Sequence, residues 1–558
     1  MVRRFFDRIA APIRGLHQAA YLLAALTLAS QALALLRDRT FAHTFGAGHV
    51  LDLYYAAFRM PDLVFALVSS LVSAYVLIPR IAGMDRAKIH GLLSQSATFL
   101  VVMGGAICAV LAVFMPQFLT LLYPDFVTST LQGQFVLLAR LLLFQPILLG
   151  LSGVLGSVTQ VHRRFVLFAL SPVLYNLGII FGTVVLYPHF GLAGIGMGVV
   201  IGAIGYVLVN VPVVVKAGVF PRLSLPRVRT MLPVIRDSVP RSLALGMSSI
   251  TLLVLTAIAS RLGTGAVSVF TLAGNLEAVP LALIGSSYAV AAFPALSEAS
   301  ADDRRAEFTR ILSASARHII LWSIVFLGLI VVLRAHLVRV ILGTGAFDWN
   351  ATRLTAALLA ILAVGLVAQG LVLLFSRALY AVRQSWRPLL YQLAGGVLTV
   401  GLALALLAMP QGGLPAWLAS FLRVGDVPGT AILLVALALG QVFLALLSLV
   451  ALASAAPGLA RSLARPLTDG AVAALAGGGA AYVTLALEGG IAPLTTLAAV
   501  FAQGLAAGVI GLAAAATALL LIGNEEFRTI VNALARLVRV RAERATVLAP
   551  SADEPPQP

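Results

Sequence analysis

Long apolar segments recur along the whole chain, and they restrict the fold more than any other feature of the sequence. A helix needs about 20 consecutive apolar residues to cross the hydrocarbon core of a bilayer. About fourteen segments reach that length, so the sequence predicts an all-α polytopic membrane protein. They lie near residues 17–44, 51–79, 92–121, 132–158, 165–187, 191–215, 242–260, 267–296, 317–342, 354–379, 388–409, 429–454, 467–487 and 492–522.

The composition agrees with a membrane protein and argues against other classes. Hydrophobic residues make up 60% of the 558 residues and charged residues 11%, whereas soluble domains are about 25% charged. The net charge is +17, and in membrane proteins such an excess marks cytoplasmic loops that meet anionic lipid. We therefore expect anionic inner-leaflet lipids, and no nucleic acid, as partners. Cys108 is the only cysteine, which excludes an internal disulfide or thiolate cluster.

Basic residues collect in alternate connections between the apolar segments. These connections lie near residues 80–88, 163–164, 216–236, 304–310, 383–387 and 461–465, and the intervening ones, such as "YPHFG" and "LEGGI", are almost free of Lys and Arg. The pattern predicts an even number of spans with both termini in the cytoplasm. Residues 1–16 are basic like a signal peptide, but the apolar run that follows is too long and lacks a clean cleavage site. We interpret that run as a retained first span.

Two short motifs occur twice. "FGAG" (45–48) precedes "SSLVSAYVLIP" (69–79), and "LGTG" (262–265) precedes "SSYAVAAFP" (286–294). The offset of six spans predicts two six-helix lobes, 17–215 and 216–454, around a central cavity.

The last hundred residues would add two more helices and a tail. Residues 455–522 would supply helices 13 and 14. In residues 523–558 we expect a cytoplasmic amphipathic helix on the inner leaflet, with Phe527, Val531, Leu534 and Val538 on one face, and a disordered tail. A solvated helical tail is the alternative for the amphipathic part.

Charged residues inside the first two spans are the main functional signal. Arg37, Asp38 and Arg39 lie in the first span, and Asp52, Arg59 and Asp62 form one stripe on the second. Each costs about 2.5 to 3.5 kcal/mol at the bilayer centre unless it faces water or a partner. One interpretation is a wet cavity whose guanidinium groups bind a phosphate-bearing ligand. The other is that Arg37 with Asp38, and Arg59 with Asp62, are internal ion pairs that hold two helices together. We favour the cavity.

Other polar residues within spans are further candidates. Gln31 and Asn275 would line the cavity, while Arg140 would either line it or extend outward to the membrane surface. Glu277 would serve proton coupling or a helix-packing hydrogen bond, and Arg377 would act near the inner end of the tenth span.

Motifs for catalysis are missing from the sequence. We find no zinc-binding His pair, phosphate-cradling loop or nucleophile elbow. The glycine run "AGGGAA" (476–481) is typical of close helix packing. We therefore expect no enzyme, metal site or cofactor, and leave open coupling to Na⁺, H⁺ or the membrane potential.

Two blocks of sequence resemble the MviN/MurJ lipid II flippase family. They are "LLRDRTFAHTFGAGHVLDLYYAAFRMPD" (35–62) and "LGTGAFDWNATRLTAALLAILAVGLVAQGLVLLFSRALYAVRQSWRP" (342–388). The resemblance implies a flippase of the multidrug/oligosaccharidyl-lipid/polysaccharide exporter superfamily in a bacterial inner membrane. It would move a polyprenyl-pyrophosphate-linked glycan outward by alternating access, with helices 13 and 14 forming a lipid-tail groove. Arg37, Asp38 and Asp52 fall on matching positions, and Arg37 would contact the diphosphate or brace the cavity gate.

The chain departs from the family pattern at three expected cavity cations. Gln31 stands where the family has an arginine, "MPDLVFALVSS" (60–70) carries no basic residue after its proline, and Gly274 with Asn275 replaces an Asp-Arg pair. Arg59 and Arg39 are the candidates to compensate. The alternatives are an exporter of another lipid-linked oligosaccharide or small molecule, and a transport-inactive scaffold that binds cell-envelope synthesis proteins.

Overall fold

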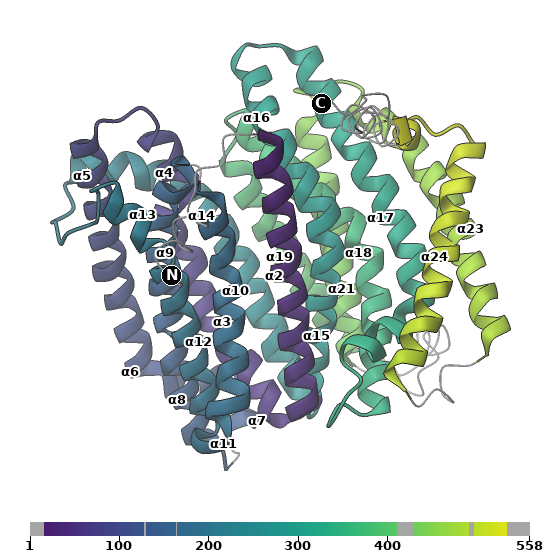
Figure 1. Cartoon of the computed structure of the whole chain (residues 1–558), viewed down its shortest axis with the longest axis horizontal. Helices are drawn as coiled ribbons and strands as arrows, with labels where there is room; N and C mark the ends of the chain where they lie inside the picture. The colour runs from purple at the N-terminus through teal and green to yellow at the C-terminus, as the bar shows by residue number, and fades with distance from the viewer. Residues whose placement is uncertain are drawn as a thin grey trace, which may run out of the picture.

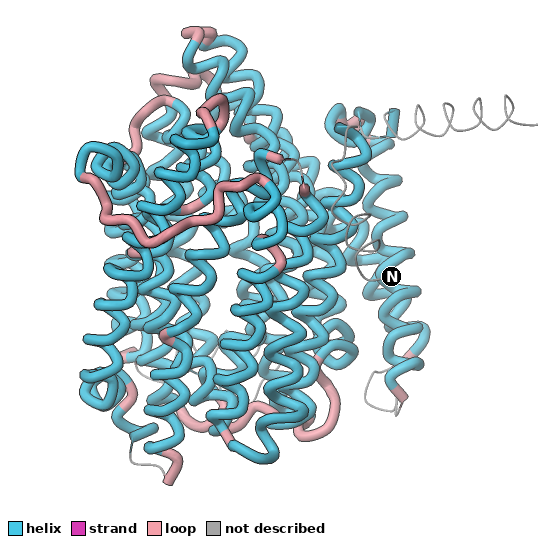
Figure 2. The backbone as a smooth tube through the Cα atoms, turned by 60° about the vertical axis from the view of Figure 1, so that its left-hand side comes forward, coloured by secondary structure: helices cyan, strands magenta, loops and turns pink. Residues whose placement is uncertain are grey.

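The fold consists of helices throughout the described part of the chain. The structure is a computed structural model that describes residues 16–127, 130–162, 164–409, 429–489, 496–529 and 531–532. No strand occurs in these ranges, as Figure 2 also shows. Long apolar segments adopt helices because a bilayer offers no hydrogen bonds to the main chain, and a helix satisfies its own.

Each of the fourteen predicted spans coincides with a helix or a broken helix. Within the described ranges, twelve helices are long and apolar enough to cross a membrane, and the bent pair His49–Leu67 and Ser69–Ile81 makes a thirteenth. The first predicted span is α2, which carries Arg37, Asp38 and Arg39 and is not among those thirteen. The chain is thus a multi-pass membrane protein.

The first six spans form one group of helices. They are α2 (Leu16–Phe45); α3 (His49–Leu67), η1 (Ser69–Val72) and α4 (Ala74–Ile81); α5 (Arg86–Phe99), η2 (Leu100–Gly104) and α6 (Gly105–Leu122); after the short α7 (Pro124–Val127), α8 (Gln132–Leu142) and α9 (Phe144–Val161); α10 (Phe165–Phe181), η3 (Gly182–Leu186) and α11 (Tyr187–Phe190); and α12 (Leu192–Leu208) with α13 (Val211–Lys216).

The next six spans form the second group, and two more helices follow. They are α14 (Val228–Ala259), followed by η4 (Ser260–Leu262); α15 (Ala266–Leu281), η5 (Ala282–Ser286) and α16 (Ser287–Ala301); α17 (Arg305–Ile341); α18 (Trp349–Ala381); α19 (Trp386–Leu407); and α21 (Gly429–Leu452). After α22 (Leu459–Ser462) come α23 (Ala464–Glu488) and α24 (Leu497–Leu521). Figure 1 shows the first group on one side, the second beside it, and α23 with α24 at the far edge.

Each copy of the sequence repeat adjoins an irregular turn in its span, although the two turns differ in type and position. The second span breaks at the 3₁₀ turn Ser69–Val72, and the eighth contains the π-helical turn Ala282–Ser286. The equivalent glycines Gly46 and Gly263 both have positive φ, +60° and +112°, whereas Gly265 has φ +84° and its equivalent Gly48 has φ −130°. Glycine tolerates a positive φ at no steric cost.

Helices α23 and α24 attach to the second group through α17. A Cβ on Gly477 of α23 would lie 2.7 Å from the Gly511 carbonyl of α24, and one on Gly328 of α17 would lie 2.8 Å from the Ala474 carbonyl. The prediction that "AGGGAA" serves close packing therefore agrees with its position. His336 of α17 and Gln503 of α24 also share a buried hydrogen bond of 2.8 Å.

The beginning of the predicted C-terminal helix docks on the protein. Phe527 packs against a cluster that includes Leu321 of α17, and Glu526 pairs with Arg317 at 3.2 Å. Leu534 and Val538, like the basic N-terminus at residues 1–15, lie outside the described residues.

Candidate functional site

A polar cavity lies between the two groups of helices. It has a volume of about 270 Å³ and receives residues from α2, α3, α9, α10 and α15. The lining comprises Arg37, Tyr54, Tyr55, Phe58, Arg59, Asp62, Gln145, Tyr175, Ile179, Thr271 and Asn275. We call it the central cavity. Four of the predicted site residues meet here: Arg37, Arg59, Asp62 and Asn275.

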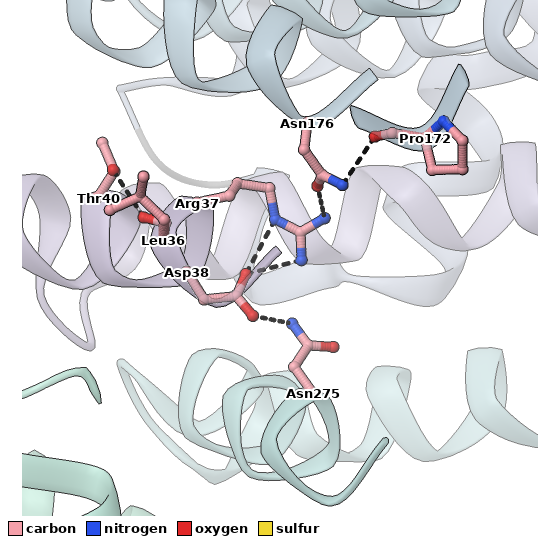
Figure 3. A network of polar contacts seen from close by, with 7 residues as sticks. All are labelled: Leu36, Arg37, Asp38, Thr40, Pro172, Asn176 and Asn275. Atoms are coloured by element: carbon pink, nitrogen blue, oxygen red, sulfur yellow. Dashed lines mark hydrogen bonds and ion pairs between the residues drawn. The ribbon is translucent and has the colours of Figure 1, made fainter. Parts of the chain in front are cut away.

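Arg37 is held at the cavity wall by a polar network that joins three helices, α2, α10 and α15 (Figure 3). Its Nε and Nη2 donate to Asp38 Oδ1 at 3.0 and 2.8 Å, and its Nη1 donates to Asn176 Oδ1 at 3.1 Å. Asp38 Oδ2 accepts a bond of 3.0 Å from Asn275 on α15. These bonds use three of the five guanidinium N–H groups. Arg37 is therefore ion-paired with Asp38 and also lines the central cavity.

Arg59 reaches from the first helix group to the second. Its Nε donates to Thr256 Oγ1 at 2.8 Å and its Nη2 to Thr271 Oγ1 at 3.3 Å. The pair with Asp62 that one interpretation required is absent from the ion pairs of the described residues, although both residues line the central cavity. The other three N–H groups of Arg59 take no part in these bonds.

A second polar cavity of about 300 Å³ opens on the other side of Arg59, within the second helix group. Its wall carries amides and hydroxyls, among them Gln369, Gln392 and Gln441. Glu277 also lines it and accepts a bond of 2.7 Å from Gln369 Nε2. This bond joins α15 to α18, as the packing interpretation of Glu277 expected, and the carboxylate nonetheless faces the cavity.

Asp52 helps to close one end of the central cavity, the end that is farther from the basic loops. Its carboxylate accepts bonds from the main-chain N–H of Gly265 at 2.6 Å and of Ser268 at 2.7 Å, and from the Ser268 hydroxyl at 2.6 Å. Asp52 thus caps α15 of the second group from α3 of the first. The prediction that it lines the cavity is not what the structure shows, since Asp52 is fully buried in this cap.

Arg39 also serves this closure instead of the cavity. Its Nη1 donates to the carbonyls of Val340 and Ile341, at 2.6 and 3.2 Å, where α17 ends and its last carbonyls lack helical partners. The turns beside it interlock, because a Cβ on Gly46 would lie 2.4 Å from the Ala346 carbonyl and one on Gly265 would lie 2.3 Å from the Ala47 carbonyl.

The two helix groups are also bonded at the basic end. Ser70 Oγ donates to Ser242 Oγ at 2.6 Å, and Ser238 Oγ donates to the Leu71 carbonyl at 2.8 Å. Arg80 forms an ion pair with Asp237 nearby. Separate sets of polar contacts therefore join the groups at either end of the central cavity.

An apolar groove of about 270 Å³ lies on the other side of α2 and α15. It is lined by Leu35, Leu276, Val279, Pro280, Leu283, Phe326, Leu329, Ile330, Leu333, Leu337, Ile341 and Leu359. Leu35 is two residues before Arg37, and Leu276 follows Asn275. The same two helices therefore present polar side chains to the central cavity and apolar ones to this groove.

Three predicted site residues lie elsewhere. Arg140 has an exposed side chain, and its Nε donates to the Ala112 carbonyl at 2.8 Å, so it follows the outward alternative. Arg377 bonds to the Leu373 carbonyl of its own helix, and Gln31 is half-buried on α2. Neither Arg377 nor Gln31 lines the cavities described above.

Sequence reasoning missed several residues of the cavity wall. Asn176, Thr256 and Thr271 hold the two arginines. Asn176 is a single amide in an apolar span, so the sequence alone could have identified it as a candidate site residue. The two threonines could not have been identified from the sequence, because a hydroxyl in a membrane helix usually bonds to its own main chain.

The family assignment rests on comparison with known proteins. The family model described as "Lipid II flippase MurJ" matches residues 41–419, which is more than half of the chain. The chain belongs to the MurJ family.

Members of the MurJ family are similar to this chain over most of their length. The "Lipid II flippase MurJ" of Burkholderia cenocepacia is 25% identical over 398 residues, covering 69% of this chain and 77% of that protein. The "Probable lipid II flippase MurJ" of Bdellovibrio bacteriovorus is 27% identical over 420 residues, covering 71% and 77%.

Solved structures of a MurJ flippase and of a multidrug transporter share this fold. A structure described as "Lipid II flippase MurJ, inward closed conformation" covers 88% of this chain and 98% of its own, with a TM-score of 0.69 and 18% identity. An inward-facing multidrug transporter of the MATE family, from the MOP superfamily, covers 78% and 99%, with a TM-score of 0.62 and 15% identity.

Proposed function

We propose that this protein is a lipid II flippase, which moves the undecaprenyl-pyrophosphate-linked peptidoglycan precursor from the inner to the outer leaflet of a bacterial inner membrane. It would act as a transporter and not as an enzyme. The single observation that carries this proposal is the arrangement of Arg37 and Arg59 around one cavity beside an apolar groove.

The arginines suit a diphosphate. Guanidinium groups bind phosphate oxygens through charge-assisted hydrogen bonds. Arg37 and Arg59 keep two and three N–H groups beyond their bonds to protein partners. Arg37 falls on a position that the family shares, and Arg59 would compensate for the three arginines that the family has and this chain lacks.

The apolar groove suits the polyprenyl tail, although it is lined by α2, α15, α17 and α18 and not by the predicted helices 13 and 14, which are α23 and α24. A lipid with its headgroup in the central cavity and its tail in the groove would run between α2 and α15. The bond between Asn275 and Asp38 crosses that boundary, so this bond would open as the lipid enters.

The contacts at both ends support alternating access. An exporter that opens to one side at a time must break one set of inter-lobe contacts while it keeps the other. The cap formed by Asp52 and the contacts around Ser242 are the two sets. We assign the basic end to the cytoplasm, with both termini there. Glu277 and Gln369 are our candidates for coupling to a proton or cation.

Binding of lipid II to purified protein tests this proposal. We expect lipid II to bind, undecaprenyl pyrophosphate to compete, and undecaprenol, which lacks the phosphates, to compete at least about tenfold less well. Arg37→Gln should lower the affinity for lipid II, whereas Arg140→Gln, the same change outside the cavity, should not. Equal competition by undecaprenol would contradict the diphosphate site, and preference for another lipid-linked oligosaccharide over lipid II would favour the alternative substrate.

A further inference from the structure

The linker between the two helix groups is a fixed segment of the surface. Residues 217–227 join α13 to α14 and contain no helix, and Figure 2 shows this stretch as a long loop in the upper half of the molecule. Three main-chain N–H groups of the linker, those of Arg222, Ser224 and Arg227, donate to Ser94 Oγ, Thr98 Oγ1 and Gln95 Oε1 at 3.0, 3.0 and 2.9 Å.

Three buried side chains of α5 hold the linker in one orientation. The acceptors, on Ser94, Gln95 and Thr98, are buried on one face of α5. Their side chains take no part in the main-chain hydrogen bonds of that helix. Their oxygens bind the linker at three points over six residues, which fixes the side of the linker that faces the protein.

The other side of the linker presents large apolar side chains. Leu223 is 87% exposed and Leu225 is 88% exposed, and Val228 and Leu232 at the start of α14 continue the patch. An apolar patch that the main chain holds outward marks an interaction surface. We call Leu223, Leu225, Val228 and Leu232 the linker patch.

Cations surround the linker patch. Residues 216–229 contain Lys216, Arg222, Arg227 and Arg229 and no acidic residue, and the three arginines are exposed. The arginines of the neighbouring connection differ, because Arg304, Arg305 and Arg310 each pair with a carboxylate of their own connection.

The position of the linker identifies what covers the patch. It follows directly on the membrane-spanning segment that ends at Lys216, so its start lies where the bilayer meets water. Apolar side chains flanked by arginines suit that interface, since the leucines enter the acyl boundary while the guanidinium groups meet phosphates.

We propose that the linker patch with Arg222, Arg227 and Arg229 is a binding site for anionic phospholipid headgroups. The site is separate from the central cavity and does not depend on the transported substrate. It holds the start of α14 at the membrane surface, on the side of the linker that faces away from α5.

A fluorescent reporter on the linker tests this proposal. The only cysteine is removed by Cys108→Ala, Leu225→Cys is labelled with an environment-sensitive dye, and the full chain is placed in nanodiscs of phosphatidylcholine with a minor share of phosphatidylglycerol. Quenching is compared between nitroxide-labelled phosphatidylglycerol and nitroxide-labelled phosphatidylcholine. We expect a preference for the anionic lipid of about fivefold or more, which corresponds to at least one arginine acting at the surface.

Two triple variants separate a specific site from general charge. Arg222→Gln, Arg227→Gln and Arg229→Gln together should abolish the preference. Arg304→Gln, Arg305→Gln and Arg310→Gln remove the same charge from the same end of the helices and should leave it unchanged. Equal quenching by both lipids, or equal loss in both triple variants, would overturn the proposal. Emission that shows the dye in water would also overturn the proposal, and it would favour a protein partner for the linker patch.

Discussion

Asp52 and Ser268 are joined by two hydrogen bonds, from the main-chain N–H of Ser268 at 2.7 Å and from its hydroxyl at 2.6 Å. The two residues are 216 positions apart and belong to different lobes. A helix N-terminus has N–H groups without helical partners and a partial positive charge. The first lobe therefore supplies the cap for a helix of the second, and this cap exists only while the lobes are closed at that end.

Asp52→Asn should weaken the closure, because the amide carries no charge and has one acceptor oxygen where the carboxylate has two. Hydrogen bonds to charged groups contribute about 1.5 to 3 kcal/mol. Ile179 lines the central cavity, and Ile179→Cys in the Cys108→Ala background places a single reactive thiol there. We expect this thiol to react with an impermeant reagent about tenfold faster or more when Asp52 is replaced by Asn than when Asp52 is present.

Asp348→Asn is the matched control. Asp348 caps α18 through the N–H of Ala351 at 2.7 Å, and both residues belong to the second lobe. Its replacement should leave the labelling rate unchanged. Equal acceleration by both variants would show that the Asp52 cap has no special part in closing the lobes.

Binding of lipid II should depend on both the charge and the shape of the Arg59 side chain. Arg59→Gln removes the charge and should lower the affinity for lipid II by about tenfold or more, as expected for loss of a charge-assisted bond. Arg59→Lys keeps the charge but cannot reach Thr256 and Thr271 together, so we expect a smaller loss. Binding titrations measure both. An unchanged affinity in Arg59→Gln would remove this residue from the diphosphate site.

The contact between α12 and the start of η3 should tolerate no side chain. A Cβ on Gly198 would lie 2.4 Å from the Cα of Gly182, so Gly198→Val should destabilise the protein by about 1 to 3 kcal/mol through overpacking. Thermal unfolding in detergent measures the loss. Gly401→Ala in α19 meets nothing within 4 Å and should be neutral or slightly stabilising. Equal stability of Gly198→Val and the parent would contradict the close contact.

The helices and their order could be predicted from the sequence because the bilayer makes length and hydropathy decisive. The irregular turns at Ser69–Val72 and Ala282–Ser286 adjoin the repeated motifs but were not predicted from them. The family resemblance found in residues 35–62 agrees with the family match over residues 41–419.

The roles of individual charges could not be predicted as well. The helical stripe placed Asp52, Arg59 and Asp62 on one face, yet Asp52 caps a helix 213 positions away while Arg59 and Asp62 line the cavity. Likewise Arg39 was predicted to line the cavity, but it bonds to carbonyls at the end of α17, and of the two alternatives for Arg140 the structure shows the outward one. Helical periodicity gives the face of a residue, and only the packing of the lobes gives its partner.

Rescue of a bacterium depleted of its own lipid II flippase tests the central claim most directly. The parent chain, Arg37→Ala and Arg140→Ala would be compared at equal abundance in the membrane. We predict growth with the parent and with Arg140→Ala, and none with Arg37→Ala. Failure of the inserted parent would contradict lipid II transport, and growth with Arg37→Ala would contradict the role of Arg37 in binding the diphosphate.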